Sequence, residues 1–188
     1  MTKVLPHDKI FLRQFVCTIL SINKTRADFF VYYSQAAVFR GLFSGVIIMY
    51  LLQTEVFFDA AHFLSGYDGK CKNLHGHRWR VVIEISSDQL TAEGQTRDMV
   101  ADFSDLKKDA REEADLLDHA LLIEEGSLKD STLNALREEG FAIVVFPWRP
   151  TAERLAHYFC DKMSLRGYPV SRVSVYETPK NCATYVVS

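Results

Sequence analysis

Three histidines in one short stretch of the chain have the spacing of a metal site. His75 and His77 are separated by one residue, so on a strand both imidazoles point to the same face. His62 closes an apolar segment upstream, and an antiparallel return of the chain would place it opposite the pair. Three neutral imidazoles with an open fourth position are typical of catalytic zinc. The spacing favours this interpretation over the alternative of ordinary surface histidines.

Cys71 lies four residues before His75, in the loop that must pass the metal. It could complete a closed Cys/His₃ structural site. It could instead act as a nucleophile or base, with its thiolate stabilised by Lys70, Lys72 and the metal. The third interpretation is an inert buried cysteine. The spacing alone does not choose between the two metal-linked interpretations.

Other acidic residues offer proton transfer or ligand binding. Asp118 precedes His119, and a carboxylate beside an imidazole can set its tautomer and pKa. Adjacent side chains often point apart, so the alternative is a charge pair at a helix end. Glu177 interrupts an apolar segment, either at an exposed edge or as an anchor for two N–H groups of a planar ligand. Glu153 lies in the predicted first turn of a helix, where a carboxylate stabilises the N-terminus.

The elements that must position these residues are predicted from residue 50 onward. Hydrophobic periodicity and turn residues predict strands at 50–61, 78–86, 141–146, 170–178 and 182–187. Helices are expected after the capping residues Asp102, Ser127 and Thr151. Paired strands separated by helices predict an antiparallel sheet with helices on one face, which is an α+β fold.

Length and composition narrow the function classes. The 188 residues suffice for one domain, or for one domain with an appendage. Lys and Arg number 22 against 24 Asp and Glu, a net charge of −2 that argues against a nucleic-acid partner. Four cysteines lie far apart, which predicts no disulfide framework and a cytoplasmic location. The longest apolar run, at 41–52, has 12 residues, fewer than the roughly 20 of a membrane span.

Residues 1–48 carry little recognisable pattern. They are either a helical extension packed on the domain or the product of a misread start, with translation beginning at Met49. The organised pattern begins just after Met49, so we expect the domain to occupy residues 49–188.

Six segments from 58 onward, taken together, resemble the 6-pyruvoyl-tetrahydropterin synthase / 6-carboxytetrahydropterin synthase family. They are FDAAH at 58–62, CKNLHGH at 71–77, ADFSDLK at 101–107, LDH at 117–119, PTAE at 150–153 and YET at 176–178. The resemblance implies the tunnelling fold (T-fold), a four-stranded antiparallel sheet with two main helices on one face. It also implies subunits that join edge to edge into a barrel, as a homo-oligomer with active sites between subunits.

The resemblance further implies a role for each matching residue. His62, His75 and His77 match the zinc ligands, and Cys71 matches a catalytic cysteine that accepts a proton. Asp118 and His119 match a second proton-transfer unit that is supplied across the interface. Glu177 matches a catalytic residue that also anchors the pterin ring. Thr151 and Glu153 match residues that line the pterin pocket.

The C-x₃-H-x-H spacing from Cys71 to His77 resembles the 6-carboxytetrahydropterin synthase branch. That branch is a zinc-dependent lyase that converts 7,8-dihydroneopterin triphosphate to 6-carboxytetrahydropterin, releasing acetaldehyde and triphosphate on the route to queuosine and other deazapurines. The alternatives are a 6-pyruvoyl-tetrahydropterin synthase and a non-catalytic, zinc-stabilised pterin-binding module. Residues 1–48 have no counterpart in the family pattern, and the segment 123–147 looks longer than in compact members.

Overall fold

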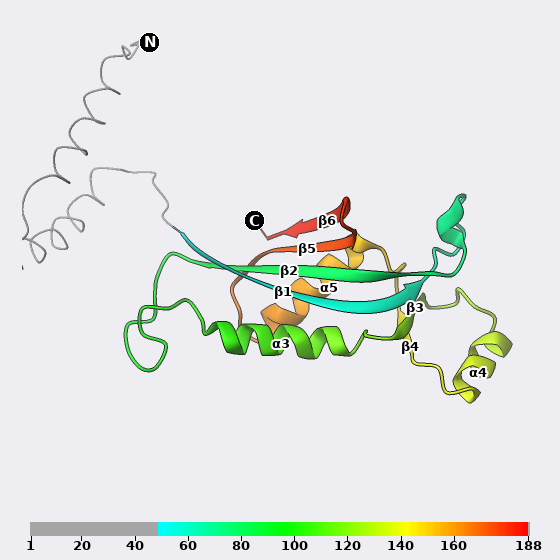
Figure 1. Ribbon diagram of the computed structural model, residues 1–188, viewed down its shortest axis with the longest axis horizontal. Helices are drawn as coiled ribbons and strands as arrows, with labels where there is room; N and C mark the ends of the chain where they lie inside the picture. Colours follow the sequence, from blue (N-terminus) through cyan, green and yellow to red (C-terminus); the bar gives the residue numbers. More distant parts are fainter. Residues whose placement is uncertain (1–48, 188) are drawn as a thin grey trace, which may run out of the picture. The chain divides into compact units, whose positions relative to one another are not determined.

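The computed structural model describes residues 49–187, so the predicted extension at 1–48 lies outside the described residues. Strands and helices follow one another along the chain as shown in Figure 1. The elements are β1 Tyr50–His62, the 3₁₀ turn η1 Lys70–Lys72, β2 His75–Ser87, α3 Phe103–Asp115, β3 Ala120–Glu124, α4 Asp130–Glu138, β4 Ile143–Phe146, α5 Ala152–Leu165, β5 Val170–Thr178 and β6 Asn181–Val186.

The two 13-residue strands β1 and β2 form the antiparallel centre of the sheet. They pair without interruption from Tyr50 opposite Ser87 to His62 opposite His75. Burial alternates along the second half of β1, as expected for a strand with one face on a core. The sequence predicted both strands and placed His75 and His77 at the start of the second, as found, three residues before the apolar pattern at 78–86 begins.

The sheet has six strands in the order β4-β3-β1-β2-β5-β6. The predicted four-stranded antiparallel sheet is correct for β1, β2, β5 and β6. It is wrong for the whole sheet, because β3 pairs parallel to β1 and β4 pairs parallel to β3. The strand β3 was not predicted, since a five-residue apolar run has no periodicity that distinguishes a strand from a buried helical turn.

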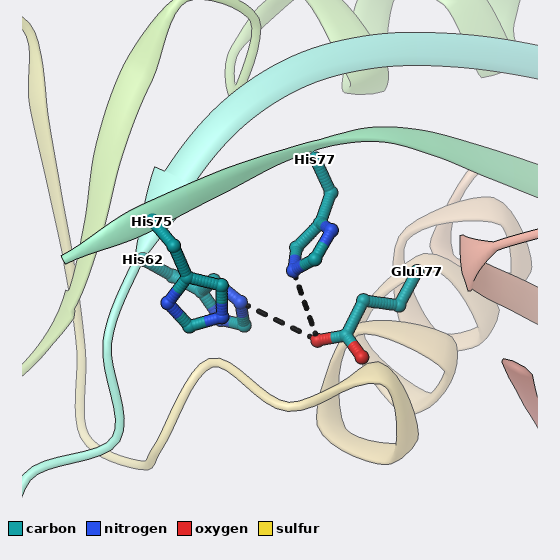
Figure 2. A group of neighbouring side chains, drawn as sticks. All are labelled: His62, His75, His77 and Glu177. Carbon is teal, nitrogen blue, oxygen red and sulfur yellow. Dashed lines mark ion pairs between the residues drawn. The ribbon is translucent and has the colours of Figure 1, made fainter. Parts of the chain in front are cut away.

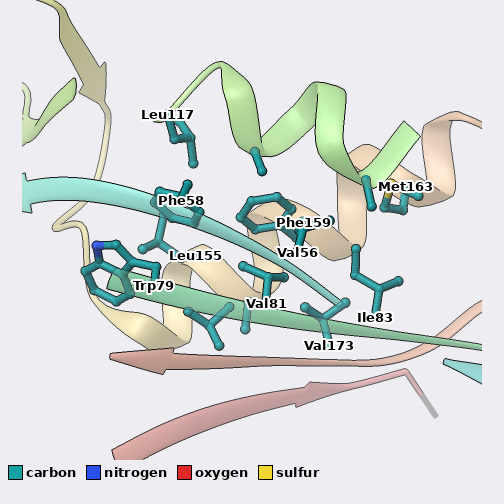
Figure 3. Close-up of a cluster of buried hydrophobic side chains, with 14 of the residues drawn as sticks. Val56, Phe58, Trp79, Val81, Ile83, Leu117, Leu155, Phe159, Met163 and Val173 are labelled. Carbon is teal, nitrogen blue, oxygen red and sulfur yellow. The ribbon is translucent and has the colours of Figure 1, made fainter. Parts of the chain in front are cut away.

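Helices α3 and α5 cover one face of the sheet, as the sequence predicted (Figure 3). Their start signals are confirmed: the Asp102 carboxylate accepts from the Ser104 N–H, and the Thr151 hydroxyl accepts from the Arg154 N–H. The predicted cap Ser127 is wrong, because α4 begins after Lys129 without a side-chain cap. The helix α4 buries none of its residues, so the core depends on the other two helices.

An ion-pair network ties the C-terminal end of α5 to α3. The Arg166 guanidinium donates to Glu113 at 2.6 and 2.9 Å and to Asp109 and Glu112 at 2.9 Å. Hydrogen bonds from Arg166 to Glu112 and Glu113 raise the pKa of the guanidinium above its ordinary value. The network therefore holds the C-terminal end of α5 against α3. Within residues 49–187, no helix is long and apolar enough to cross a membrane.

Candidate functional site

A cluster of polar side chains lies at one end of the sheet face that covers the apolar core. There the inward-facing residues of three strands change from apolar to polar. On β1, Phe58 and Ala60 are buried and the next inward position is His62, which is 1% exposed. On β2, the row that contains buried Trp79 continues to His77 and His75. On β5, the apolar row of Val173 and Val175 continues to Glu177. Strand pleating therefore gathers three imidazoles and one carboxylate at one end of the core face.

Figure 2 shows these four side chains pointing toward one another. One ligand atom from each of His62, His75, His77 and Glu177 lies within 4.8 Å of the others. Glu177 Oε1 is 3.4 Å from Nε2 of both His62 and His77. Cys71 is not a member of this group, which argues against the closed Cys/His₃ site that the sequence left open.

Two of the imidazoles are oriented by backbone carbonyls. His62 donates its Nδ1–H to the Pro150 carbonyl at 2.8 Å, and His75 donates its Nδ1–H to the Asn73 carbonyl at 2.7 Å. These bonds leave the Nε2 lone pairs free to bind a metal, the arrangement that outer hydrogen bonds impose on metal-ligating histidines. These carbonyl partners could not be predicted from the sequence, because every residue type has a backbone acceptor.

The donor set fits a metal ion. Nε2 of His62 and of His77 are buried and have no hydrogen-bond partner among the described residues. Buried polar atoms are normally paired, so two unpaired nitrogens that face one point fit the role of metal ligands. Three imidazoles with a carboxylate in reach suit zinc, which prefers nitrogen ligands in a tetrahedral arrangement.

Burial keeps these imidazoles in the form that binds metals. Removal from water lowers the pKa of His62, and the neighbouring His75 and His77 lower it further. The hydrogen bond to Pro150 and the charge of Glu177 act in the opposite direction without reversing the shift. The pKa of His77 is also lowered, chiefly by burial. Both rings are therefore neutral near pH 7, as metal ligation requires.

A buried tryptophan forms the floor of the cluster. The Trp79 indole packs edge-on against the rings of His62 and His77, with ring centres 5.0 and 5.3 Å apart. Its Nε1–H donates to the Ala60 carbonyl at 3.3 Å, and its other side stacks on Phe58. The imidazoles are thus held between strand backbone and a rigid aromatic surface.

A cavity of about 280 Å³ adjoins the cluster and collects other predicted site residues. Cys71, Thr151, Glu153, Glu177 and His62 all line it. Thr151 caps α5 and Glu153 occupies its first turn, so the helix N-terminus forms part of the wall. The structure therefore brings together the metal cluster, the candidate proton acceptor and the predicted pterin pocket within one chain.

Asp118 and His119 form a hydrogen-bonded pair away from that cavity. One Asp118 oxygen accepts from the Asp59 N–H at 2.7 Å, and the other accepts from His119 Nδ1–H at 2.9 Å. His119 also donates its backbone N–H to the Asp59 carbonyl at 2.6 Å and has a φ of 56°. Such a left-handed conformation is uncommon outside glycine and is found where a side chain must be aimed. The two side chains therefore face each other.

The His119 side chain is 80% exposed and borders a second cavity, of about 720 Å³. Asp59, Arg78, Leu121 and Phe141 also line this cavity, and so does His77 of the histidine cluster. By strand alternation, Asp59 and Arg78 belong to the face of the sheet opposite the helices. Within one chain, therefore, His119 does not share the cavity that contains Cys71.

The cluster predicts which variants lose metal. His77→Ala removes one of three imidazoles and should reduce zinc affinity more than a hundredfold. Cys71→Ser and Glu177→Gln should retain zinc, because three imidazoles suffice to hold it. Zinc content after dialysis, with far-UV circular dichroism as a check of folding, measures the outcome. Loss of zinc from folded Cys71→Ser would instead favour a closed site with a thiolate ligand.

The Asp118 contacts predict a dependence of stability on pH. The hydrogen bond from the Asp59 N–H, followed by that from His119, holds the pKa of Asp118 below its ordinary value. The ionised carboxylate therefore stabilises the fold above about pH 4, and this contribution disappears as the pH falls through the lowered pKa. Asp118→Asn should be less stable than the wild type at pH 7, with a difference that shrinks below pH 4 in urea unfolding. A difference independent of pH would contradict this assignment.

Comparisons with known proteins show the family of this chain. A model of the family described as 6-pyruvoyl tetrahydropterin synthase matches residues 51–187. A 6-carboxy-5,6,7,8-tetrahydropterin synthase from Haemophilus influenzae is 35% identical over 143 residues, which are 73% of this chain and 99% of that protein. The protein of the same name from Synechocystis is 32% identical over 139 residues, covering 73% of this chain and 93% of the relative.

Solved structures show the same fold. An uncharacterised protein from Wolinella succinogenes superimposes with a TM-score of 0.63 at 22% identity, over 75% of this chain and 99% of the other. The 6-pyruvoyl tetrahydropterin synthase of Caenorhabditis elegans superimposes with a TM-score of 0.53 at 25% identity, over 76% and 98%. The α+β T-fold expected from the sequence is thereby confirmed. With a family match that spans the whole described domain, the chain belongs to the 6-pyruvoyl tetrahydropterin synthase family.

Proposed function

We propose that this protein is a 6-carboxy-5,6,7,8-tetrahydropterin synthase. It would convert 7,8-dihydroneopterin triphosphate and one water to 6-carboxytetrahydropterin, acetaldehyde and triphosphate, in the cytoplasm and on a route to deazapurines such as queuosine. The observation that carries the proposal is the junction of a three-histidine cluster with a cavity lined by Cys71 and Glu177. The relatives of that name from Haemophilus and Synechocystis support it.

The residues of the cluster would divide between metal and substrate. Zinc held by His62, His75 and His77 would supply Lewis acidity toward the hydroxyls of the substrate side chain. Glu177 lies on both the cluster and the cavity, where its carboxylate would accept two N–H bonds from the pterin ring. Thr151 and Glu153, at the start of α5, would form the wall beside that ring.

Cys71 would accept a proton from the substrate side chain. The thiol lines the cavity and is partly exposed, so a ligand can reach it. Lys70 and Lys72 flank it in the 3₁₀ turn. A second proton transfer would use His119, whose Nδ1–H is held by Asp118 so that Nε2 remains available for exchange.

The separation of His119 from Cys71 supports a homo-oligomer with sites between subunits. His119 borders the 720 Å³ cavity, which His77 also lines, and not the cavity that contains Cys71. Exposed Leu74 and Phe141 line the same cavity as His119, and such apolar surface is typical of a contact with another chain. A second copy seated there would bring its own metal cluster toward this His119 and complete a site.

Product analysis tests the proposed reaction. Zinc-loaded protein incubated with 7,8-dihydroneopterin triphosphate should yield one acetaldehyde for each 6-carboxytetrahydropterin. Cys71→Ala should retain zinc yet lose at least about a thousandfold in kcat, the scale of a missing proton acceptor. Acetaldehyde is measured with a coupled dehydrogenase, and the pterin by chromatography.

The other outcomes are equally informative. A pyruvoyl product without acetaldehyde would identify a 6-pyruvoyl-tetrahydropterin synthase. No product at all, together with unfolding when zinc is removed, would identify a zinc-stabilised binding module.

Mixing two inactive variants tests the shared site. Cys71→Ala and His119→Ala, unfolded together and refolded in equal amounts, should regain activity, since about a quarter of sites would combine an intact Cys71 with an intact His119 from the other subunit. The matched control mixes Cys71→Ala with the Cys71→Ala/His119→Ala double variant, which offers no intact Cys71. Recovery no greater than in this control would exclude sites shared in this way.

A further inference from the structure

The loop between β1 and η1 holds an aromatic side chain, Tyr67. Tyr67 donates its backbone N–H to the Leu64 carbonyl at 3.2 Å. Leu64 in turn donates its N–H to the Cys71 carbonyl at 2.8 Å, which closes the loop on itself. The same short loop therefore fixes the positions of Tyr67 and of the candidate proton acceptor Cys71.

A glycine makes room for the Tyr67 ring. A Cβ atom on Gly69 would lie 2.5 Å from Cε1 of Tyr67, closer than any real side-chain contact. Gly69 has a φ of 171°, an extended conformation that any residue adopts, so backbone geometry does not require a glycine there. The missing side chain lets the ring approach the backbone of Gly69 closely.

The Tyr67 ring lines the 280 Å³ cavity together with Cys71, Thr151 and Glu177. It is 46% exposed, although an aromatic ring gains free energy by burial. Among the described residues that line this cavity, it is the one Phe, Tyr or Trp side chain. A planar heterocycle whose edge is bound by Glu177 would still need a surface for its face, and an aromatic ring supplies one by stacking.

We infer that Tyr67 contacts the face of the bound pterin and sets the affinity for the ring system. The inference rests on the proposed function, because the pterin is the ligand assigned there to the cavity. The contact uses the face of the Tyr67 ring and not its hydroxyl, so Tyr67 contributes to substrate binding. The proton transfers remain with Cys71 and His119. It makes Tyr67 a specificity-determining residue for flat, two-ring substrates.

Titration of zinc-loaded protein with the fluorescent pterin neopterin tests this role. Tyr67→Ala should raise the dissociation constant about tenfold, the scale of one lost stacking contact, and should raise KM for the triphosphate substrate equally. Tyr67→Phe keeps the ring and should stay within about twofold of the wild type. The control Phe103→Ala removes another exposed aromatic ring, at the start of α3, and should change neither value. Zinc content and kcat should be unaffected in all three.

Gly69→Ala provides a second variant that leaves Tyr67 in place. Its methyl group would push the ring out of position, so affinity for neopterin should fall as in Tyr67→Ala. In the Tyr67→Ala background the same methyl meets no ring, and Gly69→Ala should have no further effect. Independent, additive losses in the double variant would overturn the inference.

The outcomes separate the two proposals. Wild-type affinity in folded Tyr67→Ala, or loss of zinc from that variant, would overturn the role of Tyr67 and leave the proposed reaction standing. Failure of the wild type to bind neopterin at all would overturn both.

Discussion

The pairing of β1 with β2 is the constraint on which the site depends. Because His62 lies opposite His75, and Ala60 opposite His77, the strand register alone decides that three imidazoles meet on one face. A slip of one residue would turn the row of β1 over and send His62 to the opposite face of the sheet. The slip would also turn the buried Val56 and Phe58 of β1 away from the core and from Trp79. The apolar rows therefore prevent it. The hydrophobic core therefore specifies the geometry of the polar cluster.

Prediction from sequence succeeded where the signal was local. Asp102 and Thr151 were identified as caps because a short polar side chain before an apolar helical pattern is a local feature. The histidine cluster was predicted from spacing on two strands, which needs only that the strands be neighbours. Prediction failed where position depends on distant partners: β3 is defined by its parallel pairing with β1, and nothing in its five residues specifies that neighbour.

The same distinction explains what could be said of the site. Residue type suggested that Asp118 and His119 act together, and their hydrogen bond agrees. Residue type did not reveal that His119 and Cys71 border different cavities. That depends on how the loops that carry them leave the sheet. The carbonyls of Pro150 and Asn73, which orient two imidazoles, cannot be predicted from side-chain types.

The packing of Trp79 gives the protein an optical property of its own. Its buried indole contacts two imidazoles directly, so it lies close enough to an ion bound by them for emission to depend on that ion. A closed-shell ion such as zinc leaves indole fluorescence largely intact, whereas an open-shell ion such as cobalt quenches it at this range. Exchange of one such ion for the other at this cluster would therefore change the fluorescence of Trp79, without any added label.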